Sequence, residues 1–149
     1  MTPELELTLH FGAFPALASH RALLRRASVA RWIGHALQRP AQIAVRIVGQ
    51  DEGRTLNLQY RGQDHATNVL TFDYARAPVV MADLVLCGPV IEREAWQQGK
   101  ALKAHYAHLL VHGTLHAQGW DHEAGEGQAL AMEALEILLL GALGFPNPY

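Results

Sequence analysis

Apolar residues recur early in this chain with two different spacings, every second residue and then every three to four residues. Together these spacings limit the folds that the chain can adopt. Alternation with polar residues predicts a half-buried strand over residues 4–11, carried by Leu5, Leu7, Leu9 and Phe11. Apolar residues then recur at helical spacing from 16 to 38, and Pro40 ends the predicted helix. The chain therefore combines strands with helices.

The remaining segments show the same two patterns. Alternating residues on either side of a turn at 49–53 predict a β-hairpin, with its second strand at Leu56, Leu58 and Tyr60. We expect buried strands at 69–72 and 79–87, and helices at 89–99, 100–118 and 125–143. Because these elements do not alternate regularly as βαβ units, we predict an α+β fold, a single domain with one mixed β-sheet packed against helices.

Composition restricts the class of protein further. The chain has 149 residues, 50% of them hydrophobic, which suffices for one core of ordinary size. Charge, Pro or Gly interrupts every stretch long enough to cross a bilayer, and the acidic start is unlike a secretory signal. The single cysteine, Cys87, fits a reducing cytoplasm and cannot form a Cys-rich zinc site. Any metal ion must therefore be held by His or carboxylates.

The segment His112-Gly-Thr-Leu-His116-Ala-Gln-Gly119-Trp-Asp-His122 contains the strongest chemical pattern in the chain. His112 and His116 are four residues apart on one helix, so their rings can converge on a single ion. His122 follows six residues later, after Gly119 allows the chain to turn back. Three imidazoles with an open fourth position are typical of a catalytic zinc site, in which the metal acidifies a bound water. Three His also accept Ni or Cu, so the pattern does not name the ion.

The other histidines have weaker patterns. His105 and His108 precede this motif on the same helix, and we expect them to have structural or supporting roles. We expect the remaining four at the surface, namely His10, His20, His35 and His65.

The histidine spacing also matches that of metzincin peptidases. Those enzymes need a Glu directly after the first His as general base, and this chain has Gly113 there. A peptidase would have to use another base, and Asp121 and Glu123 are the nearest in sequence. A peptidase-like hydrolase therefore remains a minor hypothesis.

Three segments together resemble the YbeY family of bacterial endoribonucleases and rRNA maturation factors. HGTLHAQGWDH is similar to the family's HGxLHxxGYDH signature, and YRGQDHATNVLTF at 60–72 is similar to its YRGxDxxTNVLSF segment. Met81-Ala-Asp-Leu84 resembles its LGDI, and the C-terminal helix with Met132, Glu133 and Glu136 also corresponds. The chain departs from the family at four positions, with Trp120 for Tyr, Thr71 for Ser, Asp73 for Pro and Ala82 for Gly.

The resemblance implies an activity and a set of site residues. It implies a zinc-like ion bound by His112, His116 and His122, and a role in activity for Arg61. A metal ion and a guanidinium can both stabilise the charge that develops on a phosphate during RNA hydrolysis, with Arg61 as a phosphate clamp. The alternative for Arg61 is an ordinary surface salt bridge. Asp121 either orients a ligand imidazole or caps the loop after Gly119.

Charge is unevenly distributed although the formal net charge is only −2. Six arginines and no acidic residue lie between Leu7 and Gln50, whereas the chain from Ala104 onward has five acidic residues and neither Lys nor Arg. One stripe of the predicted 16–38 helix is a candidate surface for tracking single-stranded RNA, formed by Arg21, Arg25, Trp32 and Arg39. The alternative is a solvated helix face.

Three functions remain open from the sequence. The first is a zinc-dependent, single-strand-specific endoribonuclease in rRNA processing, at the 3′ end of small-subunit rRNA, and in ribosome quality control. The second is a metallohydrolase of another class, such as a peptidase. The third is a ribosome assembly factor with a largely structural metal. The expected partners are single-stranded RNA, rRNA, the small ribosomal subunit and its proteins, without a membrane.

Overall fold

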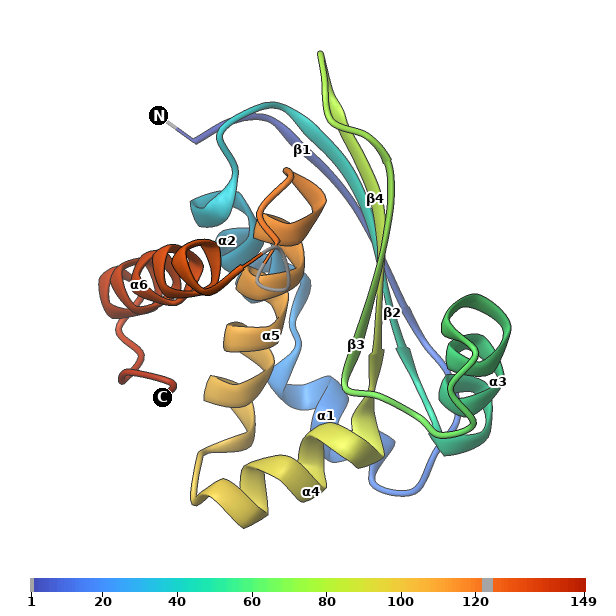
Figure 1. Cartoon of the computed structure of the whole chain (residues 1–149). Coiled ribbons are helices and arrows are strands. Elements are labelled where there is room, and N and C mark those ends of the chain that lie inside the picture. Colours follow the sequence, from blue (N-terminus) through green and yellow to red (C-terminus); the bar gives the residue numbers. More distant parts are fainter. Residues whose placement is uncertain (1, 122–124) are drawn as a thin grey trace.

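The computed structural model describes residues 2–121 and 125–149, which form a four-stranded sheet and six helices within those ranges (Figure 1). The elements in chain order are β1 (Leu5–Phe11), α1 (Leu17–Leu23), α2 (Arg26–Ala36), β2 (Ala41–Val48), α3 (Gln50–Arg61), β3 (Val69–Ala75), β4 (Val80–Cys87), α4 (Gly88–Gln98), α5 (Leu102–Ala117) and α6 (Glu126–Ala142).

The sheet has the strand order β1-β2-β4-β3. β1, β2 and β4 are parallel, and β3 runs antiparallel to β4 at one edge. A bulge interrupts the pairing of β3 with β4 between Asp73 and Ala75. Ala82, at the position where the YbeY-like pattern has Gly, is buried and pairs with Ile43 of β2 and with Asp73 of β3, beside this bulge. The predicted α+β fold with one mixed sheet in a single domain is confirmed.

Helices lie on both sides of the sheet. α2, α5 and α6 lie on one side and α3 on the other (Figure 1). α5 is buried along most of its length, and Tyr106, Leu110 and Leu115 belong to the main hydrophobic core. A smaller core under α3 includes Val48, Leu70 and Cys87. The burial of α5 fixes the position of the histidines that it carries.

The predicted hairpin is wrong. Its first strand, with Ile43, Val45 and Ile47, is present as β2, but the predicted turn and second strand lie in α3 instead. Asp51 and Glu52 lie in the first turn of α3, where negative charge interacts favourably with the helix dipole. Gly62 ends the helix with φ 69°. The alternation of apolar residues was misleading, since Leu58 is 48% exposed and the buried residues Gly53 and Asn57 follow helical spacing. A Cβ at Gly53 would lie 3.2 Å from Cys87 Sγ, so this glycine lets α3 approach β4 closely.

The single helix predicted for residues 16–38 is also wrong, since Leu24 and Arg25 separate α1 from α2. His20 and Leu24 bury one side of the first segment, and Val29, Trp32 and Ile33 bury one side of the second. On one straight helix those two sides would be about 150° apart at roughly 100° per residue. The break therefore allows both segments to face the core.

No helix within the described residues is long and apolar enough to span a membrane.

Candidate metal centre

His112 and His116 line one pocket of about 400 Å³ at the edge strand β3. Both side chains are half-buried and lie one turn apart near the C-terminal end of α5, as the sequence predicts. The other residues that line this pocket are Tyr60, Arg61, Val69, Leu70, Thr71 and Phe72. We call it the histidine-arginine pocket.

Arg61 reaches this pocket from a different element and from the far side of β3. It is the last residue of α3, an exposed position, and the helix ends at Gly62 in the left-handed conformation. The residues before Arg61 are helical rather than the predicted strand, but the structure does bring Arg61 together with His112 and His116. A guanidinium and two imidazoles separated by some fifty residues in sequence thus border one cavity.

His112 is held from behind by a carboxylate of α6. Its Nδ1 lies 2.7 Å from Oε2 of Glu136, whose side chain is buried. Burial acts to raise the pKa of Glu136, but its contacts with His108, His112 and Tyr149 outweigh burial and bring the pKa to about 2. Because the carboxylate is ionised, Nδ1 of His112 carries the proton and donates, which leaves Nε2 as the nitrogen that can bind a metal.

The contacts of Glu136 could not be predicted from the sequence, which placed this residue only on the C-terminal helix. Glu136 also accepts a hydrogen bond from the Tyr149 hydroxyl, and its Oε1 lies 3.6 Å from Nε2 of His108. One signal was present in the sequence: Glu136 interrupts a run of apolar residues, with 134–135 before it and 137–140 after it. A charge at such a position is retained only when partners satisfy it.

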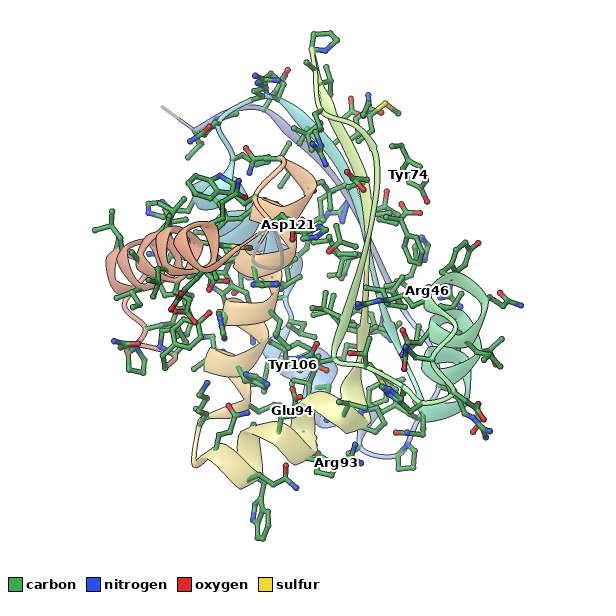
Figure 2. All side chains as sticks on the ribbon, viewed as in Figure 1. Arg46, Tyr74, Arg93, Glu94, Tyr106 and Asp121 are labelled. Carbon is green, nitrogen blue, oxygen red and sulfur yellow. The ribbon has the colours of Figure 1, made fainter. Side chains whose placement is uncertain are left out.

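His105, on the same helix as His112, is also paired with a carboxylate. His105 is 3% exposed and its Nε2 lies 2.9 Å from Glu94 Oε1, a carboxylate that also accepts from the Asn68 amide. Figure 2 shows Glu94 on α4, facing α5. Burial lowers the pKa of His105, and the bond to Glu94 opposes that shift. The structural role that we expected for this residue is supported by its contacts.

The surface position predicted for His20 is wrong. It is fully buried, with Nδ1 2.6 Å from the Tyr106 hydroxyl and Nε2 3.1 Å from Glu92 Oε1. Bonds at both nitrogens satisfy the polar ring, so it can occupy the core beside Tyr106. Helical spacing places His20 opposite the later apolar face, and only the break after α1 turns it inward.

The metal ligand set predicted from the sequence is only partly within the described residues. His122 and Glu123 lie outside residues 2–121 and 125–149, and within these ranges no group of three His, Cys, Asp or Glu side chains is placed to hold a metal ion. The contacts of His112 nevertheless suit a metal ligand. A histidine that donates one ring N–H to a carboxylate and presents the other nitrogen to a pocket is the usual arrangement around protein-bound zinc.

Asp121 and Gly113 also lie close to this region. Asp121 is half-buried in the segment after α5, between that helix and the sheet (Figure 2). Whether it orients an imidazole stays a prediction. Gly113 is buried against the sheet, and a Cβ there would lie 3.1 Å from a methyl carbon of Leu84. The position that bears the general base in metzincins therefore packs against the sheet, at Leu84 and at Thr71, whose Oγ1 would lie 3.5 Å from that Cβ.

The predicted RNA-tracking stripe is not one surface. Trp32 is 2% exposed and its ring packs edge-on against Phe145, with centroids 5.6 Å apart, so it is not available for stacking. Arg21, Arg25 and Arg39 are exposed. Arg21 and Arg25 lie on α1 and just before α2, a helix that packs on α5 and β1. Arg39 follows α2 and donates instead to the backbone carbonyl of Arg76, directly after β3. Their role in RNA binding stays a prediction.

The fold and the pocket define a structural class of protein. It is an α+β protein in which two histidines of one helix and an arginine of another line a pocket at the edge strand of a mixed sheet. A family model described as Endoribonuclease YbeY matches residues 19–144. Curated relatives named Endoribonuclease YbeY are 66% identical in Polaromonas sp. strain JS666, over 98% of this chain and 95% of the relative, and 62% identical in Paracidovorax citrulli, over 98% and 96%. The chain therefore belongs to the endoribonuclease YbeY family.

A solved structure supports the fold independently. The solution structure of TM1509 from Thermotoga maritima aligns with a TM-score of 0.58 at 22% identity, covering 92% of this chain and 91% of that one. The chain fold is therefore one that also occurs in a protein of distant sequence.

Proposed function

We propose that this protein is a zinc-dependent endoribonuclease that cuts single-stranded RNA at the histidine-arginine pocket. The observation that supports it most directly is that Arg61 from α3 borders the same pocket as His112 and His116 from α5. Family membership supplies the substrate class, since the curated relatives are named endoribonucleases. Hydrolysis of a phosphodiester requires stabilisation of negative charge on phosphate oxygens, and cationic groups in a sheltered pocket provide it.

His112 and His116 would hold the metal ion together with His122, and Glu136 would fix the ring of His112 through its Nδ1. When bound, such an ion polarises phosphate oxygen and lowers the pKa of a coordinated water. Zinc suits imidazole ligands, and its usual tetrahedral geometry would leave one position for water or substrate.

Arg61 would orient the scissile phosphate. Its guanidinium is permanently charged and planar, so it can donate two parallel hydrogen bonds to phosphate oxygens, which a single ammonium cannot do in the same geometry. Thr71 and Phe72 of β3 form the floor between the arginine and the histidines. The substrate would therefore cross the edge strand between α3 and α5.

A peptidase is less well supported than a ribonuclease. The metzincin general base follows the first His directly, and Gly113 at this position packs against Leu84. A longer side chain there would have to displace the sheet contact, so the position cannot supply a base to the pocket.

We further propose the biological setting that the family resemblance implies. The substrate would be rRNA, with maturation of the 3′ end of small-subunit rRNA and ribosome quality control as the processes. The partners would be the small ribosomal subunit and its proteins, in the cytoplasm. A ribosome assembly factor with a structural metal is the alternative within the same setting.

The decisive experiment is cleavage of a short single-stranded RNA by zinc-loaded protein, beside an identically purified His116→Ala variant that reveals contaminating nuclease. We expect cutting by the parent only. Absence of cutting by both proteins, with metal bound to the parent, would favour the assembly factor, and binding to purified small ribosomal subunits would then be measured.

A further inference from the structure

Two exposed tyrosines extend the histidine-arginine pocket onto the other side of β3. Tyr60 and Tyr74 are each 65% exposed. Tyr60 lines the histidine-arginine pocket, and it also lines a second groove of about 260 Å³ with Tyr74. Phe72 likewise borders both cavities. The two cavities are therefore neighbours that share part of their walls, and we call the second one the tyrosine groove.

Both rings are held in place by neighbouring groups. The ring of Tyr60 packs edge-on against Phe72, with centroids 4.8 Å apart and an interplanar angle of 71°. The Tyr74 hydroxyl donates to Asp83 Oδ2 at 2.7 Å. Figure 2 shows the side chain of Tyr74 on the side of the sheet that faces away from α5. Rings that are already fixed lose little conformational freedom when a flat ligand stacks on them.

The charges of the tyrosine groove indicate what it binds. Its one arginine, Arg46, is paired with Glu52 at 2.7 Å, and Asp83 adds a carboxylate. A groove with this balance does not attract phosphates, whereas neutral aromatic faces suit the π-faces of nucleobases. The two cavities therefore suit different parts of a nucleotide: the tyrosine groove suits a base, and Arg61 in the adjacent pocket suits a phosphate.

We infer that the tyrosine groove binds the nucleobases of single-stranded RNA that flank the scissile phosphate, with Tyr60 and Tyr74 as stacking surfaces. This inference rests on the proposed function, because it assigns a base-binding subsite to that same reaction. It also gives a reason for preferring single strands, since bases within a duplex stack on each other and are not available to protein rings.

The first test is equilibrium binding of a short fluorescent single-stranded RNA. Tyr60→Ala and Tyr74→Ala should each raise Kd about five- to a hundredfold, the range for loss of one base-aromatic stack. Tyr60→Phe keeps the ring and its packing on Phe72 and should remain near the parent. Tyr74→Phe keeps the ring but loses the bond to Asp83, so its Kd should lie between those of the parent and Tyr74→Ala. The matched control is Trp96→Ala on α4, which removes an aromatic residue that is 84% exposed and far from the groove residues.

The second test identifies the contact as stacking. A substrate in which one nucleotide beside the cut lacks its base should bind the parent more weakly, and the loss should not add to that of the Tyr→Ala variant at the corresponding ring. In cleavage assays KM should rise more than kcat falls. Thermal unfolding curves that match the parent would show that the variants are folded.

Two results would overturn the inference. The first leaves the proposed function intact, and the second contradicts the proposed function as well. If the parent cuts RNA while both Ala variants bind and cut like the parent, the tyrosine groove is not a base site and the proposed function stands. If the parent neither binds nor cuts single-stranded RNA, the proposed function and the inference fail together.

Discussion

At the scale of single residues, Glu136 determines what His112 can do. The carboxylate is buried on α6, and its contact with Nδ1 selects the tautomer of a histidine on another helix. The same carboxylate accepts from Tyr149 and lies beside His108. A carboxylate behind a metal-binding imidazole fixes the ring and raises its basicity. In the zinc site that we propose, metal affinity would therefore depend on Glu136.

Glu136→Gln should therefore weaken zinc binding about 10- to 100-fold, because a neutral amide holds the imidazole less firmly and no longer raises its basicity. Competition with a chromophoric chelator measures the affinity directly and does not depend on cleavage. Glu126→Gln is the control, since Glu126 is exposed in the first turn of the same helix. An unchanged zinc affinity in a folded Glu136→Gln protein would contradict the assigned role.

Arg61 allows a test of geometry at constant charge. Arg61→Lys keeps the positive charge but loses the planar fork, so we expect kcat for RNA cleavage to fall at least about tenfold, with a smaller change in RNA affinity. Steady-state cleavage kinetics and a binding titration separate the two quantities. Turnover equal to that of the parent would leave Arg61 as a surface charge only.

At the scale of elements, the sequence predicted the elements that carry the histidines better than those around them. The helix with His112 and His116 follows from its spacing and from Gly119, which has φ 107° after the end of α5. The hairpin prediction failed because Leu56, Leu58 and Tyr60 alternate by chance, while the contact of Gly53 with Cys87 depends on tertiary packing. Local spacing cannot reveal a contact that another element supplies.

The same limit explains the error at Trp32. A stripe of arginines around one aromatic residue suggested a surface, but the segment is broken after α1 and α2 turns Trp32 into the core against Phe145. Glu136 could not be assigned for a related reason. Its partners lie on α5 and at the C-terminus, and only the folded chain brings them together.

The position of α2 can be tested through stability. Trp32→Ala should lower the free energy of unfolding by about 3–5 kcal/mol, because it removes a large side chain from the core of a packed helix pair. Urea unfolding followed by circular dichroism measures the change. Trp96→Ala on the surface of α4 should stay within about 0.5 kcal/mol of the parent. A change equally small for Trp32→Ala would mean that Trp32 does not belong to the core.

At the scale of the whole molecule, polar histidines are part of the interior. His20 and His105 are buried with carboxylate partners on α4, and His108 lies beside Glu136 on α6. Buried histidines make the folded state sensitive to protons in the range where free imidazoles titrate.

His105 should make the folded protein less stable as the pH falls. Burial lowers its pKa in the folded protein below the ordinary value of 6.5, so below pH 6.5 the unfolded chain binds a proton that the folded chain does not. The stability contributed by neutral His105 is therefore fully present above pH 6.5 and is lost as the pH falls through its lower, folded-state pKa. We expect this residue to contribute a slope of up to about 1.4 kcal/mol per pH unit.

Urea unfolding of the metal-free protein at several values between pH 7.5 and 5 measures this slope, and a His105→Gln variant should show a shallower one. Gln cannot take up a proton but can still donate to Glu94, so the bond to α4 is kept while the titration is removed. His35→Gln on the exposed face of α2 is the matched control and should keep the slope of the parent. Equal slopes for the parent and His105→Gln would show that His105 does not couple proton uptake to unfolding.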